Sequence, residues 1–259
     1  MLLSKVVALV TGGGSGLGRA TALRLKKQGA TVAILDLAGD ERQKVATDMG
    51  AVFHGGSVTE EKDVHLTLDK LREAAGGRHV NVVVNCAGIA IAVKTINKGV
   101  PHPLASFEKI LHVNTVGTFN VLRLAAERMA QNQDAQTFLH DGERGVIINT
   151  ASVAAFDGQI GQAAYTASKA AIAGMCLPIA RDLAPLGIRI NTIAPGIFAT
   201  PMVDGLPPAV KEILAKQVPF PSKLGDPDVY AQLVQSIIEI PMLNGETIRL
   251  DGALRMPPK

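Results

Sequence analysis

The chain has 259 residues, a length that fits one large α/β domain or two small ones and that is sufficient to bury an extensive core. It carries 26 basic and 23 acidic residues, for a formal net charge of +3, and has no basic run suited to a nucleic-acid surface. Because there is no internal repeat, low-complexity tract or linker, we expect a single domain over residues 1–259.

The two cysteines, Cys86 and Cys176, lie in apolar surroundings without cysteine or histidine neighbours at metal-ligand spacing. Two free thiols in a reducing compartment are therefore preferred over a disulfide, and no metal site is predicted. The apolar start of the chain resembles a signal peptide, but it is too short and runs directly into a glycine-rich turn. Because no apolar run reaches transmembrane length, we expect neither secretion nor a membrane span.

The first strand is expected at residues 6–10, a continuous run of β-branched and aliphatic residues. It leads into a turn that contains Gly12, Gly16 and Gly18, and a helix follows to about residue 28. Glycines let a phosphate approach the backbone, and the start of a helix offers free N–H groups to an anion. The spacing matches neither Gly-x-Gly-x-x-Gly nor a Walker A loop, but its place between strand and helix favours nucleotide binding over an ordinary turn.

The second strand, expected at residues 31–35, ends at Asp36. A carboxylate at this point can accept hydrogen bonds from both adenosine ribose hydroxyls and would repel a 2′-phosphate. Ser15 and Leu37 stand where a phosphate-binding site would need a cation. The sequence therefore predicts NAD as the cofactor, with an ordinary turn aspartate as the alternative.

A helix over residues 40–49, a short strand at 51–53 and a helix with Thr59 as its N-cap come next. A fourth strand at 80–84 ends in small residues that would let a flat ring pass. The long connection that follows, residues 89–106, is a candidate binding loop.

One long helix is predicted over residues 107–129, with Asn114 among hydrophobic neighbours. We expect Asn114 to satisfy a nearby backbone group, and it could also distort the helix and hold a water. Residues 131–144 are polar and are expected to form a second long connection.

The central motif joins a strand ending at Ser152 to a helix that runs from near Gln162 to about residue 183. Tyr165 and Lys169 are four residues apart and so share one face of that helix. A free tyrosine has a pKa of ~10, and a neighbouring cation lowers it. Such a phenol could exchange a proton with an alcohol or carbonyl while Ser152 binds the same oxygen. Alone, Tyr-x-x-x-Lys is more often a solvated helix face, so only its context makes the motif specific.

The remaining chain is expected to contain a strand at residues 188–193, a turn-rich segment at 195–202 and a mobile helical flap at 206–216. A helix at 227–239 and a strand at 246–250 complete it. Alternating strands and helices predict an α/β Rossmann fold, a doubly wound parallel sheet of about seven strands. Ligands of such a sheet bind at the carboxyl ends of the strands, where all these motifs fall.

Together these motifs resemble the short-chain dehydrogenase/reductase family over essentially the full length. The residues that carry the resemblance are Thr11-Gly-x-x-x-Gly16-x-Gly18, Asp36, Asn85-Cys-Ala-Gly88, Asn114, Ser152, Tyr165-x-x-x-Lys169 and Pro195-Gly196. Within the family the chain is similar to members that act on 3-hydroxyacyl-CoA and hydroxysteroids. The runs that indicate this are Val146-Ile-Ile-Asn-Thr-Ala-Ser-Val-Ala-Ala-Phe156, Gly161-Gln-Ala-Ala-Tyr165, Leu177-Pro-Ile-Ala-Arg-Asp-Leu183, Val218-Pro-Phe-Pro-Ser222 and Gly252-Ala-Leu-Arg-Met256.

The resemblance implies a role for each residue of the central motif. Tyr165 would be the general acid/base, Lys169 would lower its pKa and hold the nicotinamide ribose, and Ser152 would orient the substrate oxygen. Asn114 would keep a water in a proton relay, and Gln162 would line the substrate pocket. Implied cofactor contacts are Gly12, Ser15, Gly16, Leu17, Gly18, Asp36, Ser57, Val58, Cys86, Ala87, Gly88, Tyr165, Lys169, Phe198 and Thr200.

The chain departs from the family at one position, since the family usually has aspartate, which binds the adenine amino group, where this chain has Ser57. The expected function is NAD-dependent interconversion of 3-hydroxyacyl-CoA and 3-oxoacyl-CoA, with hydroxysteroids as further substrates. The alternatives are a 3-oxoacyl-carrier-protein reductase, which Asp36 disfavours, and a non-catalytic scaffold subunit of a tRNA-processing complex. The resemblance also implies a homotetramer, in the mitochondrion for an animal protein or the cytoplasm for a bacterial one.

Overall fold

The computed structural model describes residues 3–132 and 142–258. Its centre is a seven-stranded sheet in the order β3-β2-β1-β4-β7-β8-β9, in which every neighbouring pair is parallel. The strands are β1 (Val7–Thr11), β2 (Thr31–Asp36), β3 (Val52–Gly55), β4 (Val82–Asn85), β7 (Gly145–Thr150), β8 (Ile188–Pro195) and β9 (Thr247–Leu250). The predicted α/β Rossmann fold with about seven strands is confirmed.

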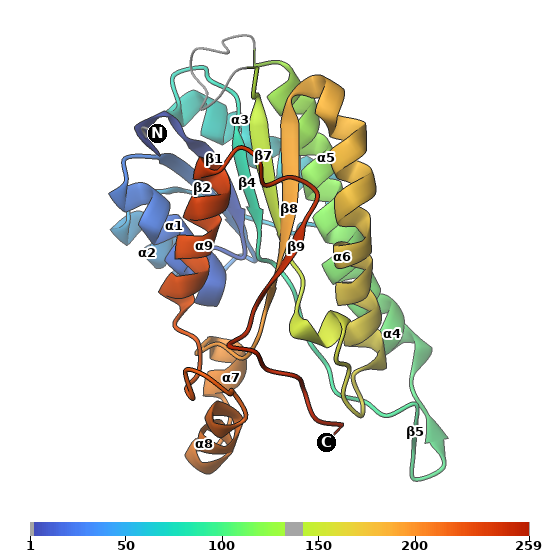
Figure 1. Ribbon diagram of the computed structural model, residues 1–259. Helices are drawn as coiled ribbons and strands as arrows, with labels where there is room; N and C mark the ends of the chain where they lie inside the picture. The colour runs from blue at the N-terminus through green and yellow to red at the C-terminus, as the bar shows by residue number, and fades with distance from the viewer. Residues whose placement is uncertain (1–2, 133–141, 259) are drawn as a thin grey trace.

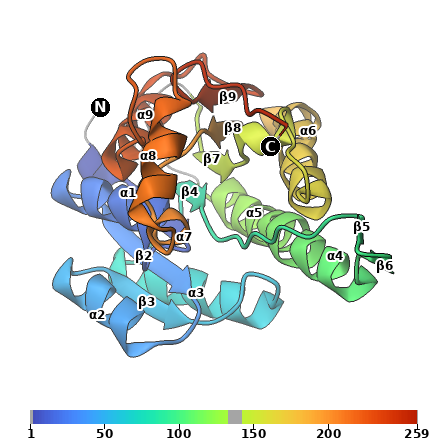
Figure 2. The same cartoon turned by 90° about the horizontal axis from the view of Figure 1, so that it is seen from below.

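Helices cover both faces of this sheet (Figure 2). One face carries α1 (Gly16–Lys27), α2 (Asp40–Asp48) and α9 (Pro227–Glu239), and the other carries α3 (Glu61–Ala74), α5 (Gly117–Ala130) and α6 (Ala163–Leu183). Strand residues alternate between the two layers, so that Val7 and Leu9 pack under one set of helices and Ala8 and Val10 under the other. Both layers are apolar, which explains why the central strands β1 and β4 are nearly continuous apolar runs.

The elements that can surround a ligand lie beyond the carboxyl ends of the strands, in the lower half of Figure 1. They are the hairpin β5 (Ile96–Asn97) and β6 (Val100–Pro101), α4 (Leu104–Leu111), α7 (Pro201–Asp204) and α8 (Pro208–Lys216). The connection 89–106 thus contains an exposed hairpin and the start of α4. The segment predicted as a helical flap forms α8, and its mobility stays a prediction.

Two sequence predictions about helices need correction. The helix expected over residues 107–129 is interrupted by a π-helical turn, His112–Val116, which separates α4 from α5 and contains Asn114. Thr59 is not an N-cap, because α3 begins at Glu61 and the Thr59 hydroxyl hydrogen-bonds the Ser57 hydroxyl at 2.8 Å. A carboxylate inside the helix, that of Asp63, instead accepts the Ser57 N–H at 2.8 Å.

The predicted connection 131–144 lies largely outside the described residues. Cys86 and Cys176 are both free thiols, as expected. In the part of the chain that the structure describes, no helix is long and apolar enough to cross a membrane. The same residues contain no cluster of histidine, cysteine, aspartate and glutamate that could hold a metal ion.

Candidate active site

A row of polar side chains runs across the carboxyl ends of three central strands. Thr11, Asn85 and Asn149 are register partners on β1, β4 and β7. Asn85 Nδ2 donates to Asn149 Oδ1 at 2.9 Å, and the Ala87 N–H donates to Thr11 Oγ1 at 3.2 Å. This row lies where the strand order reverses between β1 and β4, the point at which such sheets bind ligands.

The glycine turn after β1 leaves no room for side chains. Gly12 has a φ of +65°, and a Cβ there would lie 2.8 Å from the Ala87 nitrogen. A Cβ on Gly18 would collide with the Gly12 carbonyl oxygen. The backbone at the start of α1 can therefore approach a bound group closely, and its first N–H groups can face an anion. These residues fit the diphosphate of a dinucleotide.

Asp36 lies beside this turn at the end of β2. Its Oδ2 accepts the Gly14 N–H at 2.9 Å, and its Oδ1 accepts the Leu37 N–H at 2.8 Å. Arg42, in the first turn of α2, places Nε 3.3 Å from Oδ1. No cation was predicted next to Asp36 from the sequence, because only positions 15 and 37 were considered. Arg42 is brought to Asp36 by the loop between β2 and α2, a contact with no signature in the sequence.

Ser57 and Val58 follow β3 at the same edge of the sheet. The Ser57 hydroxyl also accepts the Thr59 N–H at 3.2 Å, so it is partly occupied within its own turn. Val58 is buried, and its carbonyl accepts Asn120 Nδ2 at 2.9 Å. These hydrogen bonds fix the turn that the resemblance assigns to the adenine.

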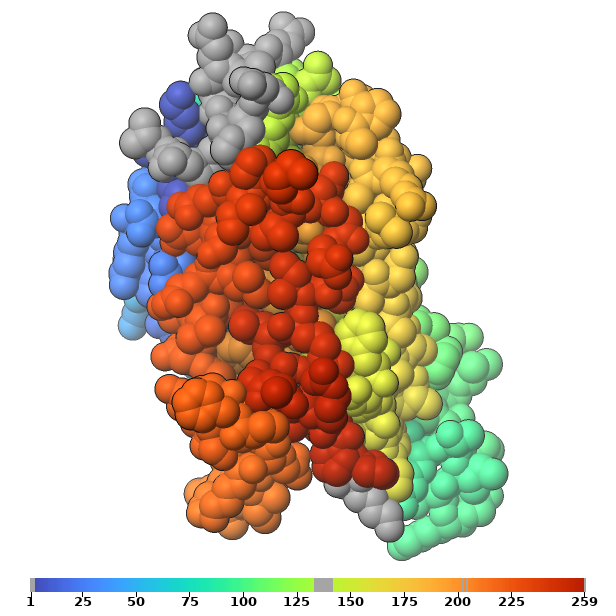
Figure 3. Space-filling model, in the orientation of Figure 1, coloured from blue at the N-terminus to red at the C-terminus, as the bar shows by residue number. Residues whose placement is uncertain are grey.

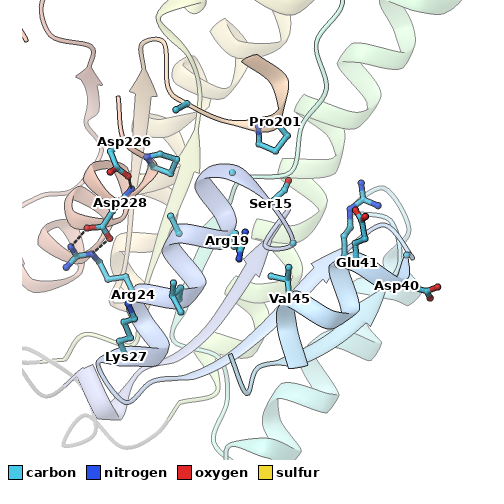
Figure 4. Close-up of a pocket in the computed structure, with 18 of the residues that line it drawn as sticks. Ser15, Arg19, Arg24, Lys27, Asp40, Glu41, Val45, Pro201, Asp226 and Asp228 are labelled. Carbon is cyan, nitrogen blue, oxygen red and sulfur yellow. Dashed lines mark hydrogen bonds and ion pairs between the residues drawn. The ribbon is translucent and has the colours of Figure 1, made fainter. Parts of the chain in front are cut away.

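A surface cavity of about 1190 Å³ begins at Gly14 and Ser15 and continues along the outer side of α1. In Figure 4 the ion pair between Arg24 and Asp228 closes one side, and Asp40 and Glu41 lie on the opposite side. The residues that line it do not include Ser152, Tyr165 or Lys169. They do not include Asp36, Ser57 or Val58 either, so only the end of the cavity at Gly14 and Ser15 meets the predicted cofactor site.

The predicted chemical residues meet where the end of β7 faces α6. The Ser152 hydroxyl lies beside the Tyr165 phenol and acts to lower its pKa. Lys169 is buried with its Nζ 5.8 Å from the centre of the Tyr165 ring. Its ammonium donates to the Thr150 carbonyl oxygen at 2.8 Å. A hydroxyl, a phenol and an amine thus lie together at the carboxyl edge of the sheet.

The pKa values of these groups differ from the expectation. Burial raises the pKa of Tyr165, and the neighbouring Ser152 hydroxyl offsets only part of this rise. Burial also lowers the pKa of Lys169 to about 8. The effect of Lys169 on the Tyr165 pKa stays a prediction, since the ammonium is directed at the Thr150 carbonyl and burial is the largest cause of both shifts.

Asn114 is fully buried in the π-helical turn, and its side chain is occupied. Its Oδ1 accepts the Ile89 N–H at 2.8 Å, and its Nδ2 donates to the Ile89 carbonyl at 2.9 Å and to Ser168 Oγ at 3.0 Å. The predicted satisfaction of a backbone group and the predicted distortion of the helix are both confirmed. The side chain holds the irregular segment after β4 against α6, which places Asn114 near Lys169 without a direct contact.

The other predicted residues also lie at this edge. Gly88 faces Lys169, since a Cβ there would lie 3.5 Å from Nζ. The Cys86 thiol points inward, 3.7 Å from the Tyr230 hydroxyl, and burial raises its pKa. Phe198 is buried after β8, and Thr200 precedes α7. Gln162 hydrogen-bonds Gln159 in the loop before α6.

The fold and this arrangement define a dinucleotide-dependent oxidoreductase with a serine, tyrosine and lysine at the strand ends. A family profile described as "short chain dehydrogenase" matches residues 6–211. The chain belongs to the short-chain dehydrogenase family and is an oxidoreductase of that family.

Curated relatives match over nearly the full length. The chain is 59% identical over 257 residues to "3-hydroxyacyl-CoA dehydrogenase type-2" of Homo sapiens, which covers 98% of this chain and 96% of the relative. It is 57% identical over 261 residues to the protein of the same name in Drosophila melanogaster, and the match covers 99% of this chain and 100% of that relative. A crystal structure of 3-hydroxyacyl-CoA dehydrogenase type-2 from Mycobacterium avium superposes with a TM-score of 0.91 at 38% identity, with 97% and 96% covered.

Proposed function

We propose that the protein is an NAD-dependent dehydrogenase that interconverts 3-hydroxyacyl-CoA and 3-oxoacyl-CoA. The observation that carries this proposal is the position of the Tyr165 phenol between Ser152 and the buried amine of Lys169, where the end of β7 faces α6. The names of relatives more than half identical over the full chain support the substrate class. Hydroxysteroids are a second substrate class, supported by the sequence resemblance alone.

In this proposal the Tyr165 phenolate takes the proton of the substrate alcohol in oxidation, and the Tyr165 phenol gives a proton to the carbonyl oxygen in reduction. Ser152 hydrogen-bonds the same substrate oxygen and holds it against the phenol. Lys169, which donates to the Thr150 carbonyl, stabilises negative charge that develops on Tyr165. NAD, when bound, accepts or returns the hydride. Asn114 fixes the backbone beside Lys169, and a water retained near it would relay the proton outward.

The preference for NAD rests on Asp36, whose carboxylate lies beside the glycine turn and would repel a 2′-phosphate. The ion pair with Arg42 reduces that repulsion without removing it. The two nucleotides of the cofactor would lie one after the other along the strand ends. They would be held by the glycine turn after β1, Asp36, the turn at Ser57 and the Tyr165–Lys169 pair. A homotetramer, and a mitochondrial or bacterial cytoplasmic location according to the source, complete the proposal.

The decisive assay is oxidation of NADH with acetoacetyl-CoA, with NADPH in parallel. Turnover with NADH and weaker activity with NADPH is the expected result. Faster turnover with NADPH would favour a biosynthetic reductase that acts on carrier-protein substrates. No turnover by a folded, NADH-binding protein would favour a non-catalytic scaffold in a tRNA-processing complex.

A further inference from the structure

The end of the chain lies directly on the loop that precedes α6. Gln159 Nε2 donates to the Pro257 carbonyl at 3.0 Å, and the Ile160 N–H donates to the Pro258 carbonyl at 3.1 Å. In Figure 3 the red tail lies against the yellow-green segment that contains this loop. The loop, residues 156–162, begins after Ser152 and ends at Gln162. The tail is thus in direct contact with the segment between two proposed substrate-binding residues.

Arg249, the third residue of β9, joins the loop and the tail. Its Nη2 lies 2.6 Å from Asp157 Oδ2, and the same nitrogen donates to the Leu254 carbonyl at 2.8 Å. Its Nε lies 2.7 Å from Asp251 Oδ2, and the guanidinium stacks 5.4 Å from the centre of the Phe156 ring. The guanidinium beside Asp157 holds the pKa of that carboxyl below its usual value. The planar guanidinium of Arg249 therefore contacts both the loop and the tail.

The loop is held from a second direction, and the tail has a second contact of its own. The Val93 N–H donates to the Gly161 carbonyl at 2.8 Å, so the loop lies between the tail and the irregular segment after β4. The turn at Gly252 accepts the Phe220 N–H at 3.3 Å, which connects the tail to the segment between α8 and α9. Gln159 also connects the tail to Gln162, because its Oε1 accepts Gln162 Nε2 at 3.3 Å.

We propose that the C-terminal tail, residues 251–258, positions the substrate-binding loop 156–162 and through it Gln162, with Arg249 as the positioning residue that joins the two. The tail itself contacts no reacting atom. Its effect falls on substrate binding because the loop carries Gln162, whereas the cofactor side at Gly12 and Asp36 belongs to other elements. This inference rests on the proposed function, since its kinetic test uses acetoacetyl-CoA.

The test compares a chain ending at Met256, which lacks both acceptor carbonyls, with a chain that lacks only Lys259 and keeps them. Arg249→Lys, which retains the charge but not the planar fork, is compared with Arg255→Lys, whose exposed side chain pairs with Asp251 and does not reach the loop. Hydrogen exchange of the peptide covering 156–162 is measured for each, together with KM, kcat and the Kd for NADH.

Truncation at Met256 and Arg249→Lys should accelerate exchange in this peptide and raise KM for acetoacetyl-CoA by about tenfold, with a smaller change in kcat. The Kd for NADH should stay within about twofold, as for both controls. Unchanged exchange would overturn the positioning contact, and faster exchange with unchanged KM would overturn its role in substrate binding. A wild-type protein that does not turn over acetoacetyl-CoA would instead defeat the proposed function, and the exchange measurement would still decide whether the tail holds the loop.

Discussion

At the scale of single residues, the central observation is that burial acts in opposite directions on Tyr165 and Lys169. It raises the pKa of the phenol and lowers that of the amine to about 8. Both shifts favour the neutral forms. Without ligands, the protein therefore keeps Tyr165 and Lys169 uncharged more readily than the Tyr-x-x-x-Lys motif suggests. A charge on either side chain must be stabilised by the cofactor or substrate that binds beside it.

Replacing Tyr165 by Phe tests the proton transfer. The ring is retained and only the hydroxyl that Ser152 binds is lost, so turnover of acetoacetyl-CoA should fall by about 10²–10⁴-fold. Binding of NADH should change little, because the glycine turn is untouched. Steady-state kinetics on the folded variant decide the matter, and near-normal turnover would mean that Tyr165 is a packing residue.

The lowered pKa of Lys169 predicts a pH dependence of stability. Below pH 8 the amine is protonated in both states, but between about 8 and 10.5 the unfolded state holds the proton and the folded state does not. Stability contributed by this group therefore rises with pH across that window. Lys169→Met removes the effect, so its stability advantage over the wild type should shrink by about 1–2 kcal/mol between pH 7.5 and 9.5. Urea unfolding at both pH values measures this, and a constant difference would contradict the shifted pKa.

Arg42 predicts a relaxed cofactor choice. Its guanidinium offsets the charge of Asp36, so Arg42→Ala should increase the ratio of NADPH Kd to NADH Kd by about two- to fivefold. Asp36→Ala combined with Leu37→Arg should reverse the preference. Titration calorimetry with both dinucleotides gives the ratios, and Lys44→Ala, an exposed change on the same helix, is the control. An unchanged ratio for Arg42→Ala would mean that the ion pair does not affect the discrimination.

At the scale of elements, the sequence predicted the strands well because most contain a run of β-branched or aliphatic residues, as β1, β2, β4 and β7 do. The π-helical turn was not predictable in detail, since the apolar periodicity continues from α4 into α5 across Asn114. The start of α3 was misplaced because Glu60, not Thr59, is the N-cap, and the Ser57 and Thr59 hydroxyls bond each other in the turn before the helix. Local patterns thus located the elements, while competing side chains decided their ends.

Arg189 connects β8 to the end of α9, and its replacement is expected to lower the stability of the protein strongly. It projects from β8, donates to the carbonyls of Ile237 and Leu243 at 2.9 and 2.8 Å, and lies 2.8 Å from Glu143. Its side chain is 9% exposed, and it satisfies carbonyls at and beyond the end of α9. Arg189→Leu should lower the free energy of unfolding by about 3–5 kcal/mol, since Glu143 and these carbonyls would lose a buried partner.

Urea unfolding measures this loss, and Arg181→Leu, at an exposed position on α6, provides the comparison. The Kd for NADH of the folded fraction should not change, because Arg189 lies at the opposite end of the sheet from the glycine turn. A loss below about 1 kcal/mol would place Arg189 among ordinary surface pairs.

At the scale of the whole molecule, the sequence located the site better than it located the contacts that hold it. Gly12, Asp36 and Ser152 lie at or just beyond strand ends, and Tyr165 and Lys169 lie in the first two turns of α6, so the parallel topology gathers them at one edge. Other contacts join residues that are far apart in the chain or that follow no regular spacing. They are the contacts of Arg42, of Arg249 and of the C-terminal tail. No periodicity encodes them, and only the folded structure brings them together.

The final prediction concerns assembly. Apolar side chains remain exposed on the face formed by α4 and α5, where Leu104, Val116 and Phe119 are 68%, 48% and 44% exposed. Gly174, on the neighbouring α6, has no atom near its missing side chain, which leaves space for a partner helix. Burying such a surface against another copy would remove it from water. We therefore expect a homotetramer with four times the 27.1 kDa chain mass.

Light scattering at micromolar concentration measures the assembled mass directly. Introducing Val116→Glu and Phe119→Glu together should reduce it, because two carboxylates would be buried without partners in the interface. Leu23→Glu is the matched control, since Leu23 is 37% exposed but lies on α1 on the other face of the sheet. A monomeric wild type would contradict the tetramer. A wild-type tetramer that the double variant leaves intact would place the interface elsewhere on the molecule.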